Sequence, residues 1–178
     1  MAKILAWAAY MAKARHKLFQ TEKAVELGSA ERRLLRLLQR NNTLTNLQLA
    51  EKANMSPPTC LRRVRELRAE GVIVGDVSLV DPFKVGKSLI VIVEIVLELM
   101  QEHLIVEFEN KIRAEPAITQ CYAISGDTDF LLIIVLDDMP AYMKLIRRLF
   151  VNDPNIRNFR SLFVLERPKF STEIPIDQ

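Results

Sequence analysis

The chain has 178 residues, 49% of them hydrophobic, which provides enough apolar side chains for one sizeable domain or two small ones and excludes an intrinsically disordered protein. The formal net charge is +3, but residues 1–75 carry 14 Lys/Arg against 6 Asp/Glu, whereas the remainder carries 11 against 16. This asymmetry predicts an N-terminal part that binds a phosphate-rich partner, more weakly as salt rises, and a C-terminal part that does not.

Residues 1–28 are predicted to be an extension ahead of the first domain. Residues 4–12 form an apolar run after Lys3 that resembles the hydrophobic part of a signal peptide, but basic residues follow where a cleavage site needs small ones. We therefore expect a helical extension, or a true start at Met11 or later, and a cytoplasmic protein.

No segment predicts a membrane span or a metal site. The longest apolar stretch, residues 89–100, is short and contains two glutamates. Cys60 and Cys121 have no spacing typical of a disulfide or a metal site, which fits a reducing cytosol.

Residues 29–75 are predicted to form a helix-turn-helix domain. A first helix over residues 29–40 carries leucines that can cover two further helices. Those two helices lie within residues 46–70, on either side of a break at residues 53–56. Together they complete a three-helix unit.

Local signals set the ends and the buried face of the last of these helices. Ser56 is expected to cap it through its hydroxyl, Pro57 to occupy its first turn, and Gly71 to end it. At 100° per residue, one side of the helix collects its apolar side chains. The predicted core residues are Cys60, Leu61, Val64 and Leu67.

The opposite side of this helix is polar and basic. It carries Pro58, Thr59, Arg62 and Glu66, flanked by Arg63 and Arg65, whereas Arg68 lies near the core side and is expected to snorkel. A helix that packs on one face and presents its N-terminal half and arginines on the other can read the major groove of DNA. A solvated surface helix is the alternative, which the preceding helix and tight turn disfavour.

Residues 76–88 are predicted to be a linker. An extended stretch follows the helix, and Asp81, Pro82 and Gly86 then indicate a turn. An extended segment at this point suits either a wing or a strand that leads into the next domain, and the sequence does not decide between them.

From Leu89 onward the pattern changes to strand, helix, strand, strand, helix, strand. The predicted segments are residues 89–100, 102–115, 118–125, 130–136, 140–150 and 156–166. This order predicts a ferredoxin-like α/β sandwich over residues 89–168, with an antiparallel sheet, both helices on one face and a tail over residues 169–178. The fold class is therefore α+β, with a winged-helix-like helix-turn-helix domain first.

The first predicted strand has two apolar faces. One is formed by Leu89, Val91, Val93, Ile95, Leu97 and Leu99 and is expected to pack on the two helices. The other face contains Ile90, Ile92, Glu94, Val96 and Glu98 and is too apolar to face water. We infer that a second copy covers it, and the resulting homodimer presents two reading helices to a two-fold operator.

A polar loop over residues 125–130 separates the two central strands. Asp127 or Asp129 can bind the ammonium of a small zwitterion, and amides around Gly126 can bind its carboxylate. An ordinary hairpin turn is the alternative, which the residues alone favour. No nucleophile, histidine, metal set or phosphate loop accompanies the two carboxylates, so no catalytic residue is predicted and an enzyme is rejected.

The chain resembles the Lrp/AsnC, or feast/famine, transcriptional regulators over roughly Val25 to Ile176. The most specific segments are LAEKANMSPPTCLRRVRELRAEGVI, VDPFKVG and CYAISGDTDFLLIIV, in this order. The resemblance implies a ferredoxin-like ligand-binding domain that dimerises through its sheets, with dimers assembling into tetramers or octamers.

The resemblance also implies the residues of two sites. The DNA-reading positions fall on Ser56, Pro58, Thr59, Arg62, Arg63 and Arg65. The amino-acid effector is bound between dimers near Gly126, Asp127, Thr128, Asp129 and Phe130, with Arg160 and Ser161 on the other wall. Arg160 departs from the family, which commonly has a threonine there, and it either narrows the pocket or pairs with the effector carboxylate.

The sequence therefore predicts a cytoplasmic, homo-oligomeric, sequence-specific transcriptional regulator modulated by an amino acid, such as leucine or another small amino acid. It predicts no cofactor, no metal and no membrane partner. Two alternatives remain: an architectural protein that compacts DNA without an effector, and a ligand-sensing module whose helical unit no longer reads DNA.

Overall fold

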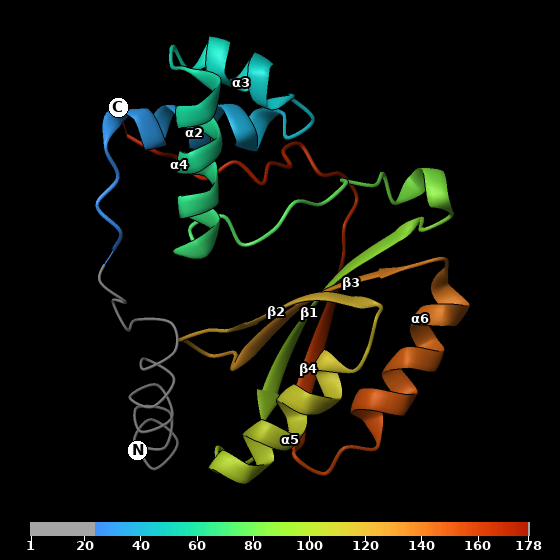
Figure 1. Cartoon of the computed structure of the whole chain (residues 1–178). Coiled ribbons are helices and arrows are strands. Elements are labelled where there is room, and N and C mark those ends of the chain that lie inside the picture. The colour runs from blue at the N-terminus through green and yellow to red at the C-terminus, as the bar shows by residue number, and fades with distance from the viewer. Residues whose placement is uncertain (1–23, 178) are drawn as a thin grey trace. The chain divides into compact units, whose positions relative to one another are not determined.

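The computed structural model describes residues 24–177 (Figure 1). The predicted extension over residues 1–28 falls almost entirely outside this range. The described chain divides into two compact units, one formed by residues 24–79 and 168–177 and the other by residues 80–167. The chain therefore passes from one unit to the other twice.

Three helices build the first unit: α2 (Ser29–Arg40), α3 (Asn46–Lys52) and α4 (Pro57–Ala69). Helix α3 begins with a capping box, in which the Thr45 hydroxyl accepts from the Gln48 amide and the Gln48 side chain accepts from the Thr45 amide. The helix-turn-helix prediction is confirmed.

The ends of α4 follow the sequence signals in part. Pro57 occupies the first turn as predicted, but the Ser56 hydroxyl caps no amide and instead contacts Thr59 Oγ1 at 2.8 Å. The neighbouring hydroxyl therefore replaces the backbone amide as its partner. At the other end Gly71 has φ +72°, and the Gly71 and Val72 amides bond to helical carbonyls in a Schellman motif.

The core of this unit is small. Its main cluster consists of the buried residues Leu34, Leu49, Ala50, Ala53 and Cys60, with Val64 packed against them. Leu35 and the predicted core residue Leu67 are also buried. Leu61 was predicted to join this core but is 40% exposed. Helices α2 and α3 are short and cover only a narrow stripe of α4, so the buried or partly buried apolar positions of α4 are Cys60, Val64 and Leu67, at i, i+4 and i+7.

Arg68 differs from its prediction as well. Its side chain is largely exposed and its guanidinium lies 2.6 Å from Asp76. The described residues between Gly71 and Ser88 form no strand, so the chain after α4 is neither a hydrogen-bonded wing nor a leading strand. The 3₁₀ turn η1 (Phe83–Val85) and Gly86, with φ +83°, form the predicted turn.

The second unit has the predicted βαββαβ order. Its elements are β1 (Leu89–Leu97), α5 (Glu102–Arg113), β2 (Ile118–Ala123), β3 (Phe130–Leu136), α6 (Met139–Ile146), the π-helical turn η2 (Arg147–Val151) and β4 (Ile156–Phe163). The strands lie in the order β2-β3-β1-β4 with every pair antiparallel. This is the ferredoxin-like arrangement (Figure 1).

Both helices of this unit cover one face of the sheet. Val91, Val93, Ile95 and Leu97 of β1 are fully buried beneath them, as predicted, whereas Leu99 lies beyond the end of the strand and is half-exposed. On the opposite face Ile92, Leu131 and Ile133 are only partly buried. Within residues 24–177 no helix is long and apolar enough to cross a membrane.

Candidate DNA-binding and effector sites

The outer face of α4 forms a shallow groove with a volume of about 390 Å³. Its lining residues are Pro58, Leu61, Arg62, Arg65, Glu66 and Ala69. Three of these, Pro58, Arg62 and Arg65, are predicted DNA-reading positions. The groove therefore combines an apolar floor with two guanidinium groups on an accessible helix face, which suits contacts to base edges and phosphates.

The arginines of α4 differ in their surroundings. Arg62 donates to both carboxylate oxygens of Glu66, at 2.6 and 2.9 Å, one turn along the same helix. Arg65 forms no ion pair within the described residues. Arg63 forms an ion pair with Glu31 of α2, and both side chains are mostly shielded from solvent. Arg63 thus braces α4 against α2.

Ser56 and Thr59 lie together at the N-terminal end of α4, where their hydroxyl oxygens are 2.8 Å apart. Ser56 is exposed and Thr59 is half-buried. Hydroxyls in this position can donate to a phosphate, and the helix N-terminus adds a partial positive charge. Pro58, Arg62 and Arg65 thus line the groove, Ser56 and Thr59 lie at the N-terminal end of the same helix, and Arg63 is turned towards α2.

The β2–β3 loop is closed by a hydrogen bond from the Ile124 amide to the Asp129 carbonyl at 3.0 Å. Between these residues, Gly126 has φ +132°, a conformation that favours glycine. Gly126 and Asp127 are exposed and Thr128 is half-buried. These three residues are the accessible part of the predicted effector set.

Asp129 has a structural position instead. It is 4% exposed, and its carboxylate accepts from the Leu97 amide at 2.7 Å. Its own amide donates to the Ile95 carbonyl at 2.9 Å. The Asp129 side chain thus supports β1 where its pairing with β4 shifts register, between Val96 and Leu97.

Phe130 also faces inward. It is 1% exposed, and its ring centroid lies 4.9 Å from that of Phe108 on α5. The pattern of glycine, two aspartates and an aromatic residue thus divides into an exposed half and a buried half. Strand β3 begins at Phe130, and the first residue of a buried strand belongs to the core.

Arg160 and Ser161 of β4 point to opposite faces of the sheet. The Arg160 Nε atom lies 2.7 Å from Glu94 Oε2 on the open face, where the two residues are cross-strand partners. The Ser161 hydroxyl contacts the Tyr142 hydroxyl of α6 on the helix-covered face. One pocket therefore does not hold both side chains, a result that alternation along a strand predicts once the strand is known.

These surroundings shift three pKa values. The hydrogen bond from Arg160 lowers the pKa of Glu94, and burial opposes this only in part. The same hydrogen bond raises the pKa of Arg160. Burial raises the pKa of Tyr142, partly offset by the Ser161 contact. Glu94 is thus an ionised partner of Arg160 that sequence reasoning did not identify, because only the strand register places the two residues together.

Sequence comparisons identify both domains. The Lrp/AsnC ligand binding domain matches residues 90–174, and a winged helix-turn-helix DNA-binding domain matches residues 29–74. An uncharacterized HTH-type transcriptional regulator of Sinorhizobium fredii is 38% identical over 86% of this chain and 91% of its own length. The chain belongs to the Lrp/AsnC family of transcriptional regulators.

Other Lrp/AsnC relatives extend this agreement. The leucine-responsive regulatory protein of Escherichia coli is 32% identical over 85% of this chain and 92% of its own length. A transcriptional regulator of Neisseria meningitidis in complex with L-Met has a TM-score of 0.81 at 28% identity, covering 84% of this chain and 97% of that one. An AsnC family regulator of Agrobacterium tumefaciens gives 0.80 at 33% identity, with the same coverage.

These matches establish the function at the level of class. The chain is a transcriptional regulator with a DNA-binding helix-turn-helix domain and an effector-binding domain. Its curated relatives are regulators of transcription. Within residues 24–177, no group of three or more His, Cys, Asp or Glu side chains is placed to bind a metal ion.

Proposed function

We propose that this Lrp/AsnC regulator reads operator DNA through the outer face of α4 and that a small amino acid modulates the binding. The groove lined by Pro58, Arg62 and Arg65 carries the first part of the proposal. Arg62 is held by Glu66 in an exposed ion pair, which is weak enough to exchange for a base or a phosphate. The remaining reading positions are Ser56, Thr59 and Arg63.

Substitution of Arg62 tests the reading surface. Arg62→Ala should weaken operator binding by about 1–3 kcal/mol and relax sequence preference if this side chain contacts a base. Arg68→Ala is the matched control, because Arg68 lies on the same helix but pairs with Asp76 outside the groove. Gel-shift titrations of both variants at one salt concentration measure the difference, and unchanged affinity of Arg62→Ala would remove this residue from the interface.

The second part of the proposal places an amino-acid effector at the β2–β3 loop. The L-Met complex of the Neisseria relative supports an amino acid as the ligand class. Asp127 is the exposed carboxylate of the loop and is the group we assign to the effector ammonium. Gly126 and Thr128 supply the adjacent backbone and hydroxyl, and Arg160 is assigned to the effector carboxylate. Asp129, Phe130 and Ser161 are assigned no contact with the effector. Their contacts within the fold hold in place the strands and the loop that carry the other residues of the site.

A thermal-shift screen against the twenty amino acids identifies the effector. Asp127→Ala should abolish the stabilisation that the effector produces while leaving DNA binding largely intact. Glu166→Gln, which removes one exposed carboxylate from the same unit, should respond as the parent does. A full response of Asp127→Ala would place the pocket elsewhere.

The open face of the sheet supports a homodimer. Ile92, Leu131 and Ile133 stay partly accessible there, and a second copy can bury them. Dimers assemble further into tetramers or octamers, and the effector changes either this assembly or the dimer geometry. Light scattering with and without the effector measures the change.

An architectural DNA-binding protein without an effector is the alternative. It predicts equal affinity for a promoter and for bulk DNA, and no thermal shift with any amino acid. Operator selectivity at physiological salt together with one stabilising amino acid excludes it. We infer a cytoplasmic location and no catalytic activity from the same regulatory role.

A further inference from the structure

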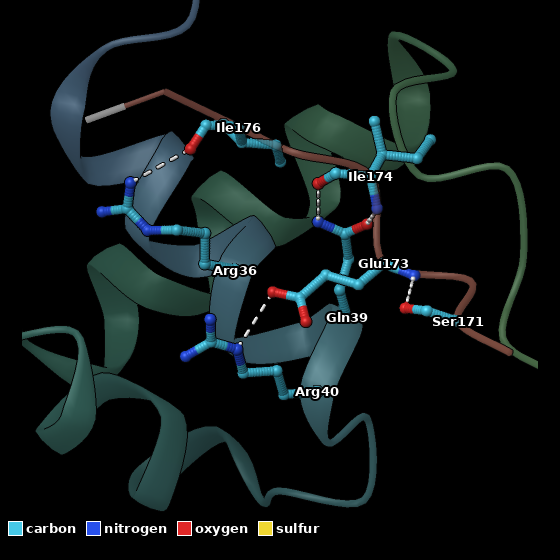
Figure 2. Close-up of polar contacts among 7 residues, drawn as sticks. All are labelled: Arg36, Gln39, Arg40, Ser171, Glu173, Ile174 and Ile176. Carbon is cyan, nitrogen blue, oxygen red and sulfur yellow. Dashed lines mark hydrogen bonds and ion pairs between the residues drawn. The ribbon is translucent and has the colours of Figure 1, made fainter. Parts of the chain in front are cut away.

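The C-terminal tail lies along α2 in the DNA-binding unit (Figure 2). Its closest contact is a pair of hydrogen bonds to one side chain. Gln39 Nε2 donates to the Ile174 carbonyl at 3.1 Å, and the Ile174 amide donates to Gln39 Oε1 at 2.6 Å. The side-chain amide thus pairs with an extended residue as a neighbouring strand does, and it fixes the register of the tail to a single residue.

Arginines on the same side of α2 contact the tail on both sides of Ile174. Arg40 Nε lies 3.0 Å from Glu173 Oε1. Arg36 donates to the Ile176 carbonyl at 3.4 Å and Arg32 to the Asp177 carbonyl at 3.4 Å. These helix positions are three to four residues apart and form one stripe, so the whole stripe follows one extended segment.

The tail is shaped for this contact. The Ser171 hydroxyl accepts from the Glu173 amide at 3.1 Å, which turns the chain just before the paired residues (Figure 2). Ile176 is half-buried, whereas Ile174 is 69% exposed. Exposed hydrogen bonds and one partly buried side chain make a specific but weak contact, of the kind that opens and closes locally without unfolding the domain.

The tail is also a second covalent connection between the two units. The tail follows β4, which belongs to the unit formed by residues 80–167, yet it packs within the other unit. The two units are therefore joined covalently at residues 79–80 and again at residues 167–168, and the second connection acts only while the tail stays on α2. A tail that both docks on α2 and leaves it would provide two discrete states of the kind that a regulatory domain can bias.

We propose that residues 171–177 are a releasable intrachain clasp on α2, which restrains the DNA-binding unit relative to the end of β4. Gln39 is the recognition residue that sets the register of the clasp, and the Arg40–Glu173 pair reinforces this register. The proposal goes beyond DNA reading and effector binding, because it assigns a docking surface to the face of α2 that neither site uses.

Amide hydrogen exchange tests the docking. The Ile174 amide should exchange about tenfold faster in Gln39→Ala than in the parent chain, because that substitution removes its acceptor. Thr172→Ala, a tail substitution outside the contacts with α2 described above, should leave the Ile174 rate unchanged. Parent exchange equal to that of a synthetic peptide of residues 168–178 would overturn the proposal. This readout does not depend on operator binding, so it separates the clasp from the proposed function.

A charge exchange tests the register and the intrachain assignment. Arg40→Glu and Glu173→Arg should each accelerate Ile174 exchange, and the double variant should restore protection. An intrachain clasp predicts that mixing the two single variants restores nothing. If the tail docked on a partner chain, mixed dimers would pair Arg40 with Glu173 and the substituted residues with each other. Recovery on mixing would therefore overturn the assignment.

The restraint itself is tested with operator DNA. Gln39→Ala removes no charge and no residue of the α4 groove, so its binding changes only if the clasp orients the unit. We expect operator affinity to fall about threefold through lost preorganisation. Unchanged operator affinity in a variant whose tail is shown by exchange to be released would overturn the restraining role.

Discussion

The two units of this regulator are stabilised on different scales. Within the described residues, the main hydrophobic cluster of the α/β unit contains 17 buried side chains, whereas that of the helix-turn-helix unit contains 5, two of them alanines. A small unit buries a smaller fraction of its surface. The DNA-binding unit therefore relies on local caps, on the Arg63–Glu31 pair and on the tail for stability that the α/β unit obtains from its interior.

The difference extends to how polar groups are used. In the α/β unit the Asp129 carboxylate is buried and holds a strand in place. In the DNA-binding unit most charged groups stay near water, where each ion pair contributes little and exchanges readily with a ligand. The exposed ion pairs of the DNA-binding unit can thus exchange their partners for DNA, whereas the buried Asp129 carboxylate keeps its partner.

Matched truncations of the two cores should show the largest effects. Leu34 and Leu132 are both fully buried, and each change to alanine should cost about 2–5 kcal/mol. Leu34→Ala should abolish DNA binding, because the helical unit has few other buried side chains to keep it folded. Leu132→Ala should leave the helical unit folded. Hydrogen exchange followed separately in each unit measures the outcome. Equal loss of protection in both units in both variants would show that the units unfold together.

Asp129 and Asp127 lie in one loop, but Asp129 is buried and Asp127 is exposed. Asp129→Ala should destabilise the α/β unit by about 1–3 kcal/mol, because it removes the acceptor of a buried amide. Asp127→Ala should change stability by less than about 0.5 kcal/mol, as an exposed surface substitution does. Urea midpoints of both variants without effector measure the two losses of stability, and similar midpoints would contradict the structural role of Asp129.

The Glu94–Arg160 pair should give the smallest effect. Because Arg160 lowers the pKa of Glu94 in the folded state, its contribution is present above the unfolded pKa of a glutamate and is lost as pH falls through the folded pKa. Glu94→Gln should therefore flatten the fall in stability on acidification, by less than about 1 kcal/mol because the Arg160 side chain is largely exposed to solvent.

Urea midpoints between pH 7 and acid conditions measure this slope. Glu98→Gln is the control, since Glu98 lies 3.9 Å from Arg157 and both side chains are exposed. An identical slope in Glu94→Gln and in the parent chain would remove the ion pair from the acid response.

The sequence by itself determined the order and type of the elements. Period-3.6 and period-2 apolar patterns, Pro57 and Gly71 act within a few residues of backbone, so they predicted the helix pair and the βαββαβ order. The family resemblance added the two sites, whose individual residues stay predictions. The domain boundaries stay predictions as well, although the tail packs with the helical unit.

Only the tertiary structure decided which of these residues are buried and which side chains pair with one another. Leu61 is apolar but exposed because α2 and α3 do not reach it, and Asp129 is charged but buried because the Leu97 amide meets it. Arg160 donates a hydrogen bond to Glu94, and the Ile174 amide donates one to Gln39, each across a long sequence separation. Burial and pairing depend on neighbours that the fold brings together, and a local pattern contains no information about them.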